Sequence, residues 1–142
     1  MSTQRPSNAP FEWPLRIYWE DTDAGGIVFY ANYLKFFERA RTEWLCTKGI
    51  GQQALRDATG GMFVVSDAQV RYLAPARLDD ELIVTASPQE VGRASMTLWQ
   101  QAFLKTPTHT TLLCEATIRI GWINAHSYKP ARIPPSLLEA LT

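Results

Sequence analysis

Apolar and polar residues change their spacing along the chain near residue 30. Over residues 15–20 the two kinds alternate, which is typical of a half-buried β-strand with Leu15, Ile17 and Trp19 on its apolar face. From about Tyr30 to Lys48 the apolar residues fall three and four apart, which predicts a helix of about 25–28 Å. Its bulky apolar face holds Tyr33, Phe36, Phe37, Ala40 and Trp44.

The second half of the chain alternates again, in four segments. Residues 50–61 between the helix and these segments look irregular, with a short helical turn near residues 52–56. Strands are predicted around residues 67–72, 82–86, 93–105 and 111–122, with a hairpin turn at residues 106–109. The last strand alternates most regularly, with Leu112, Cys114, Ala116, Ile118, Ile120 and Trp122 on one face. The proline-rich tail, 129–135, is expected to run along the surface toward the apolar residues Leu137, Leu138 and Leu141.

One strand, one long helix and four strands joined by short turns predict an α+β fold. A single helix covers only one face of a five-stranded sheet, and the large aromatic residues on this helix favour a sheet that curls around it. We expect residues 1–12 to be a flexible N-terminal segment and residues 13–142 to be a single domain.

Composition narrows the class of protein. Of the 142 residues, 46% are hydrophobic and the acidic and basic side chains balance at 14 each, which argues against binding nucleic acid through a basic field. Cys46 and Cys114 show no metal-site spacing with His109 or His126, so we expect no metal and two reduced, packed cysteines. The first ten residues lack an apolar leader and no apolar run approaches the ~20 residues of a membrane span, so we expect a cytoplasmic protein.

The segment between Glu20 and Tyr33 carries the most chemical information. Asp23 lies about seven residues before the predicted start of the helix, too far for an ordinary N-cap. Gly25 and Gly26 follow it, which suits a sharp turn or a close approach of the backbone to a ligand. Because a helix N-terminus presents unpaired N–H groups, a carboxylate beside it is suited to attack on a polarised carbonyl group.

The D-x-D-x-x-G pattern from Asp21 to Gly26, followed by an apolar run and an aromatic residue, resembles the signature of the 4-hydroxybenzoyl-CoA thioesterase family. Within that family the chain is most similar to the Tol–Pal-associated acyl-CoA thioesterases. The resemblance covers roughly residues 15–135 and implies a hotdog fold, in which a curled antiparallel sheet wraps one long helix. It implies hydrolysis of an acyl-CoA, with Asp23 as nucleophile or general base and the Tyr30 backbone N–H polarising the thioester carbonyl.

If the substrate is an acyl-CoA, the residue types suggest where it lies. The expected substrate-binding residues are Gly25, Gly26, Val28, Phe29, Tyr33, Arg93 and Arg132. The two arginines are the first candidates for the phosphates of coenzyme A, with Arg71 and Arg77 as others. An apolar wall for the acyl group is expected from residues 29–37 together with residues 64–68. No separate cofactor is implied, because coenzyme A is part of the substrate. The family's sites form between subunits, so a homodimer or homotetramer is expected.

Two other functions use the same fold. A hotdog hydratase relies on a histidine at the junction of loop and helix, and residues 20–49 contain none. A non-catalytic adaptor that binds acyl-CoA or an acyl-carrier protein needs neither Asp23 nor the two glycines, and all three are present. Both alternatives therefore rank below the thioesterase, whose acyl group remains open between aliphatic and aromatic.

Overall fold

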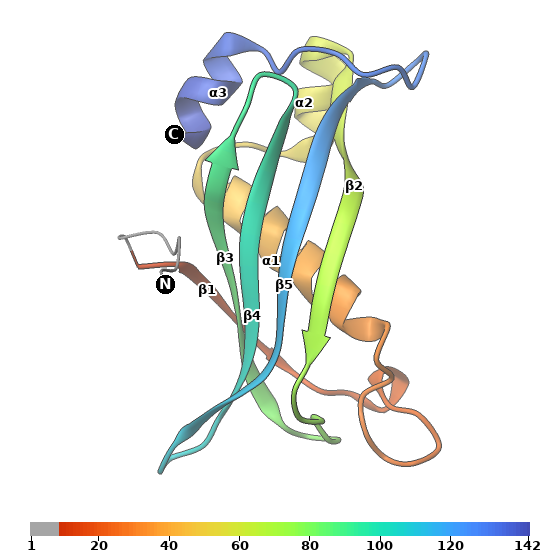
Figure 1. The fold of residues 1–142 in the computed structure, drawn as a ribbon, viewed down its shortest axis with the longest axis vertical. Helices are drawn as coiled ribbons and strands as arrows, with labels where there is room; N and C mark the ends of the chain where they lie inside the picture. Colours follow the sequence, from red (N-terminus) through yellow and green to blue (C-terminus); the bar gives the residue numbers. More distant parts are fainter. Residues whose placement is uncertain (1–8) are drawn as a thin grey trace.

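The structure, a computed structural model, describes residues 9–142 (Figure 1). The elements run in the order β1 (Phe11–Arg16), η1 (Trp19–Asp21), α1 (Asn32–Thr47), α2 (Gln52–Thr59), β2 (Gly61–Tyr72), β3 (Glu81–Val91), β4 (Ser95–Lys105), β5 (Thr110–Asn124) and α3 (Pro135–Leu141). The long helix predicted from about Tyr30 to Lys48 is confirmed, and the helical turn predicted near residues 52–56 is the start of α2.

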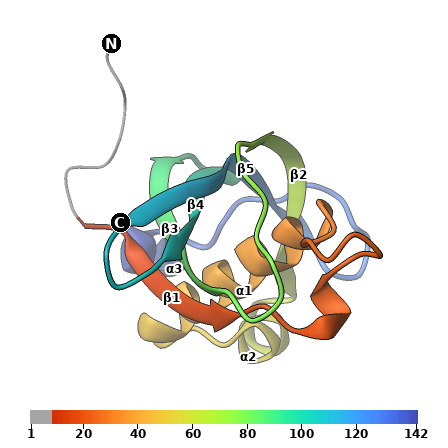
Figure 2. The same cartoon turned by 90° about the horizontal axis from the view of Figure 1, so that it is seen from below.

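All five strands form one antiparallel sheet in the order β1-β3-β4-β5-β2. Figure 2 shows the sheet from one end, with α1 lying inside its curve. The predicted α+β fold, with one long helix wrapped by a curled five-stranded sheet, is therefore confirmed. In this order β1 and β2 are the two edges of the sheet.

The core lies between α1 and the concave face of the sheet. Phe36, Phe37 and Ala40 on α1 are fully buried, as the helical spacing predicts. Large apolar side chains such as Phe36 and Phe37 contribute about 1.5–3 kcal/mol each when buried. A polar contact adds to the same interface, because the buried Gln100 amide donates to the Phe37 carbonyl oxygen at 3.0 Å and accepts from Arg41 at 2.9 Å.

The first strand lies earlier than predicted. β1 begins at Phe11, inside the segment 1–12 expected to be flexible, and residues 1–8 of that segment lie outside the described residues. The chain leaves the sheet after Arg16, and the predicted strand position of Trp19 falls in the 3-10 turn η1, where its side chain is 81% exposed. The strand prediction for residues 15–20 is therefore wrong beyond Arg16.

The later strands are confirmed with local differences. β2 starts at Gly61 rather than near residue 67, and β3 continues through Pro88, where the register shifts before Glu90. In β5 a second shift leaves Leu113 between the residues that pair with Ala102 and Phe103. Leu113 is consequently buried and Leu112 only half-buried, whereas the rest of the predicted β5 face is buried as expected.

The tail packs more closely than predicted. Ile133 is fully buried, and its N–H donates to the Arg93 carbonyl oxygen at 2.7 Å. The apolar residues that follow form the short helix α3, in which Leu137 and Leu141 are buried.

Cys114 is buried as expected, but Cys46 is exposed, so the prediction of two packed cysteines is wrong for Cys46. Among residues 9–142, no helix combines the length and apolar character that crossing a bilayer requires.

Candidate active site

The residues from Asp21 to Phe29 form a small hairpin that ends where α1 begins. Thr22 and Val28 face each other across it, and the Asp23 N–H donates to the Ile27 carbonyl oxygen at 2.8 Å. Gly26 closes the turn with φ of 80°, a conformation that residues with a Cβ rarely adopt. The two glycines of the motif thus serve the turn that carries Asp23 at its tip.

The Asp23 side chain is exposed at the tip of this hairpin. One carboxylate oxygen accepts the Gly25 N–H at 2.8 Å, which fixes the side chain against its own turn. Among the described residues no lysine, arginine or histidine pairs with Asp23. An exposed, negatively charged oxygen without a counter-ion is available to act on a ligand or on water.

Tyr30 lies at the other end of the hairpin, two residues before α1. Its backbone N–H donates to no acceptor among residues 9–142, as is common for the first N–H groups of a helix. Its side chain is 62% exposed and packs on the rings of Phe29 and Tyr72, with centroids 5.0 and 5.8 Å away. Residues 23–30 therefore present an exposed carboxylate without a counter-ion and an N–H without an acceptor among the described residues.

A shallow apolar pocket of about 260 Å³ opens beside the start of α1. Ile27, Val28, Tyr30, Tyr33, Tyr72, Leu73, Ala74 and Pro75 line it. Tyr33 is both a packing and a lining residue, because its hydroxyl accepts the Ala76 N–H at 3.3 Å inside the core. Burial raises the pKa of Tyr33 to about 12, so its phenol stays neutral at physiological pH.

The sequence pattern does not predict the far wall of this pocket. It comes from the loop between β2 and β3, where Ala76 accepts the Val28 N–H at 2.9 Å and so joins the loop to the hairpin. The adjacent residues Ala74 and Pro75 signal a turn in the sequence, but nothing in the pattern indicates what the turn contacts. Residues 64–68 do not line the pocket; Val64 and Val65 line a separate one of about 150 Å³ beside α1 and α2.

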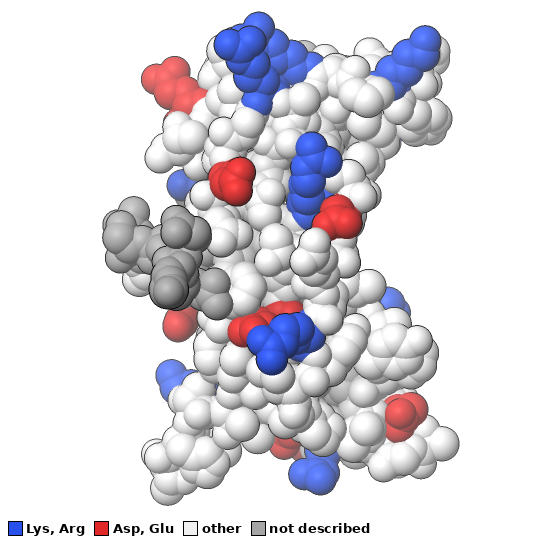
Figure 3. All heavy atoms as spheres, in the orientation of Figure 1, with Lys and Arg blue, Asp and Glu red and all other residues white. Residues whose placement is uncertain are grey.

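Within one chain the two candidate arginines lie far from Asp23. Arg93 is in the turn between β3 and β4 and Arg132 is in the tail beside it, at the end of the sheet opposite the hairpin (Figure 1). β3 alone has 11 residues and spans about 35 Å between the two ends. Figure 3 shows a group of basic side chains at that far end, with others spread over the rest of the same face. The fold brings Arg93 and Arg132 together but not to the Asp23 of the same chain.

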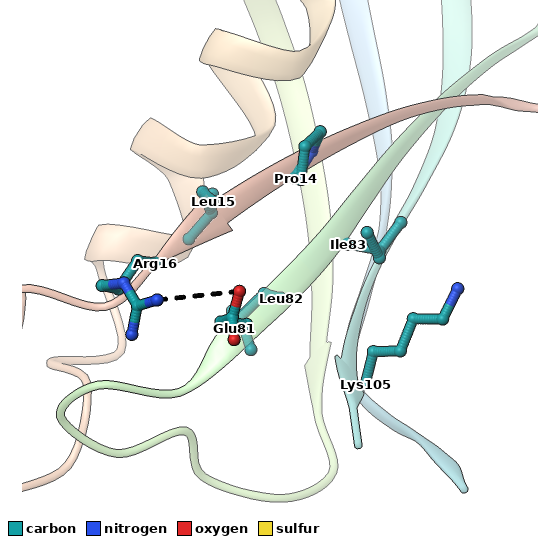
Figure 4. A pocket seen from close by; sticks show the side chains of 7 residues that line it. All are labelled: Pro14, Leu15, Arg16, Glu81, Leu82, Ile83 and Lys105. Carbon is teal, nitrogen blue, oxygen red and sulfur yellow. Dashed lines mark ion pairs between the residues drawn. The ribbon is translucent and has the colours of Figure 1, made fainter. Parts of the chain in front are cut away.

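A further pocket, of about 290 Å³, lies at the edge of the sheet over β1, β3 and β4. Figure 4 shows Arg16 and Glu81 facing each other there, 3.7 Å apart, with Lys105 pointing away. No residue of the hairpin lines this pocket, and the glutamate is paired. Its chemistry therefore offers no alternative to the site at Asp23.

Comparison with known proteins identifies the family of the chain. Residues 17–141 match the thioesterase-like superfamily. The chain belongs to that superfamily. It is 39% identical over 130 residues to an acyl-CoA thioesterase YbgC of Haemophilus influenzae, covering 92% of this chain and 93% of that protein. It is 41% identical over 128 residues to an acyl-CoA thioester hydrolase YbgC of Escherichia coli O6:H1, covering 90% and 92%.

Solved structures of this superfamily share the fold. A 4-hydroxybenzoyl-CoA thioesterase variant in complex with 4-hydroxybenzoyl-CoA superposes with a TM-score of 0.87. The superposition covers 94% of this chain and 99% of that one, at 18% identity. This similarity confirms the predicted hotdog fold. The superfamily match and the two YbgC relatives confirm the resemblance to the thioesterase family.

Proposed function

We propose that the protein hydrolyses the thioester of an acyl-CoA to a carboxylic acid and coenzyme A, with Asp23 as the catalytic carboxylate. The observation that carries the proposal is the hairpin, which presents an exposed carboxylate and the free Tyr30 N–H from one segment. The names of the relatives, which are 39% and 41% identical over most of their length, support the choice of an acyl-CoA as substrate.

Two routes fit a carboxylate at this position. Asp23 attacks the thioester carbon, the coenzyme A thiolate leaves, and water then hydrolyses the mixed anhydride. Alternatively Asp23 takes a proton from a water molecule, which attacks the thioester carbon as the thiolate leaves. In both routes negative charge develops on the carbonyl oxygen, and the Tyr30 N–H stabilises it by about 3–4 kcal/mol, as single donors do in comparable sites.

The acyl group is assigned to the apolar pocket beside the start of α1. Val28, Tyr30 and Tyr33 line it, with Phe29 next to it in contact with Tyr30. Rings that meet edge to face, such as Tyr33 and Tyr72 at 5.8 Å, provide a surface for both aromatic and aliphatic groups. Gly25 and Gly26 contribute by shaping the turn that holds Asp23.

A second copy of the chain would bring basic residues to this site. β2 is an edge strand, and Val65 at its middle is 51% exposed, so the strand is free to pair with another strand. Antiparallel pairing of two β2 strands about a two-fold axis lays the far end of one sheet beside the near end of the other. Arg93 and Arg132 of the second copy then lie at the same end as Asp23, where they are suited to the phosphates of coenzyme A.

Thiol release from a panel of acyl-CoA esters tests the catalytic assignment. Asp23→Asn keeps an oxygen that accepts the Gly25 N–H, so the hairpin is expected to survive while kcat falls by about 10²–10⁴-fold. Asp57→Asn, on the exposed surface of α2, is the matched control and should retain the wild-type rate. If Asp23→Asn keeps full activity, the assignment is wrong. If the wild type binds the esters without releasing thiol, the protein is an adaptor.

Light scattering tests the assembly. Val65→Arg places a charge at the middle of the free edge and should reduce the molar mass to that of one chain, with loss of activity. Gln53→Arg on α2 adds the same charge at another exposed position and should leave mass and activity unchanged. A wild type that already has the mass of one chain and is fully active would exclude the two-copy site.

A further inference from the structure

Asn32 is a buried polar side chain beside the hairpin. It is the first residue of α1 and is only 9% exposed. Its side-chain amide donates to the Asp21 carbonyl oxygen at 2.8 Å, and its backbone N–H donates to the Phe29 carbonyl oxygen at 2.9 Å. One residue of the helix thus contacts both ends of the hairpin that carries Asp23.

These contacts meet at the base of the hairpin. The Asp21 carbonyl oxygen also accepts the Phe29 N–H, at 3.0 Å, so it receives two hydrogen bonds, one from each side of the junction with α1. The Asp21 carboxylate accepts the Tyr18 N–H at 2.8 Å and is itself buried, which holds the incoming chain. The base of the hairpin is therefore fixed, while its tip at Asp23 is exposed.

The bond to Phe29 also sets the direction of the Tyr30 N–H. The Phe29 carbonyl and the Tyr30 N–H belong to one planar trans peptide group and point in opposite directions. Because the backbone N–H of Asn32 holds that carbonyl, the Tyr30 N–H is turned away from the first turn of α1. The side chain and the backbone of Asn32 thus control the two groups that the proposed reaction needs.

We propose that Asn32 is a positioning residue, which fixes the Asp23 hairpin relative to the Tyr30 N–H through its side-chain bond to Asp21. The inference rests on the proposed function for its effect on the rate, but not for its effect on the hairpin. An asparagine is suited to this place because the amide supplies a donor to a carbonyl that already accepts one bond.

Asn32→Asp separates positioning from folding. Aspartate has the same shape, but when ionised it has no donor and places negative charge against the Asp21 carbonyl oxygen. The helix itself does not suffer, since a negative charge in the first turn is favourable. Asn124→Asp is the matched control at the far end of β5, where the side-chain oxygen only accepts, from the His126 and Ser127 N–H groups at 2.9 Å each.

The test combines steady-state kinetics with amide hydrogen exchange. For Asn32→Asp we expect kcat to fall by up to about 100-fold, as a misplacement of about 1 Å can cause, and KM to change by less than about 3-fold. Exchange should become faster in residues 21–31 and stay unchanged in residues 36–47 of α1. Asn124→Asp should match the wild type in kcat, KM and the exchange of residues 21–31.

The outcomes distinguish this inference from the proposed function. Wild-type exchange of residues 21–31 in Asn32→Asp overturns the inference, whatever the activity. A wild type that hydrolyses no ester refutes the proposed function, while faster exchange confined to the hairpin still supports the role of Asn32 in holding it. Faster exchange throughout α1 would show a general loss of structure and would also overturn the positioning role.

Discussion

Replacing Gly61 with alanine should destabilise the fold, because an aromatic ring occupies the place of the new methyl group. Gly61 is the buried first residue of β2. A Cβ atom built on it lies 2.3, 2.4 and 2.6 Å from the Cζ2, Cε2 and Nε1 atoms of Trp122 on β5. Carbon atoms normally approach to about 3.5–4.0 Å, so the indole would have to move by roughly 1 Å or more.

The indole has little room for such a movement. Trp122 is 3% exposed and packs edge to face on Phe63, with ring centroids 5.0 Å apart. Overpacking of this kind costs about 1–3 kcal/mol, and three simultaneous short contacts with a rigid ring place Gly61→Ala in the upper half of that range. At about 3 °C per kcal/mol for a domain of this size, the thermal midpoint should fall by about 6–9 °C.

Gly121 on β5 provides the matched control. Neither Gly61 nor Gly121 has a positive φ, and a Cβ on Gly121 meets nothing within 4 Å. Since alanine is better than glycine in a strand by about 0.5–1 kcal/mol, Gly121→Ala should be neutral or stabilising. Thermal unfolding at a fixed protein concentration measures both variants. A Gly61→Ala midpoint equal to the wild type, or an equal fall in Gly121→Ala, would refute the steric reasoning.

Two further predictions concern titratable side chains. In the native protein at pH 8, iodoacetamide should modify exposed Cys46 but not Cys114, because burial raises the pKa of the Cys114 thiol to about 12; two adducts per native chain in the mass spectrum would contradict this. Tyr33→Phe removes the acceptor of the buried Ala76 N–H and should lower the free energy of unfolding by about 1 kcal/mol in urea. Burial raises the pKa of Tyr33 from 10.0 to about 12, so the stability that its neutral phenol contributes is intact below pH 10 and is lost as the pH approaches 12. The stability of Tyr33→Phe should therefore fall less steeply over that interval, and equal slopes would show that Tyr33 does not titrate there.

The helix and the last strand could be predicted because each buries one continuous face. Phe36, Phe37 and Ala40 recur at helical spacing and are all fully buried. In β5 the alternation holds from Cys114 to Trp122. Before Cys114 the register shift inserts one residue, so Leu113 is buried and Leu112 is turned away from the core. A shift of this kind depends on the partner strand, so the alternation of a single strand does not reveal it.

The displaced first strand has a different cause. Phe11, Trp13 and Leu15 also lie at every second position, but Pro14 among them argues against a strand in the interior of a sheet. β1 is an edge strand, where proline is tolerated. The strand ends because the Asp21 carboxylate takes up the Tyr18 N–H and starts the turn η1.

The candidate site could be predicted only in its local part. The motif around Asp23 indicated a turn before a helix, and the structure has a hairpin there, followed by α1. The wall from Tyr72 to Pro75 joins the pocket through contacts between segments about 40 residues apart or more, for which the sequence carries no periodic signal. The distance of Arg93 from Asp23 likewise follows from the length of β3 and the order of the strands, which local patterns do not determine.

Pro14 also limits how the sheet can grow. β1 and β2 are its two edges, and a proline in the middle of β1 lacks the N–H that a further strand would need. The 12 residues of β2 contain no proline. If two copies pair through β2, each uses the edge that accepts a strand and leaves β1 facing outward. Such an assembly closes on itself, so the edge that permits a dimer does not open a route to fibres.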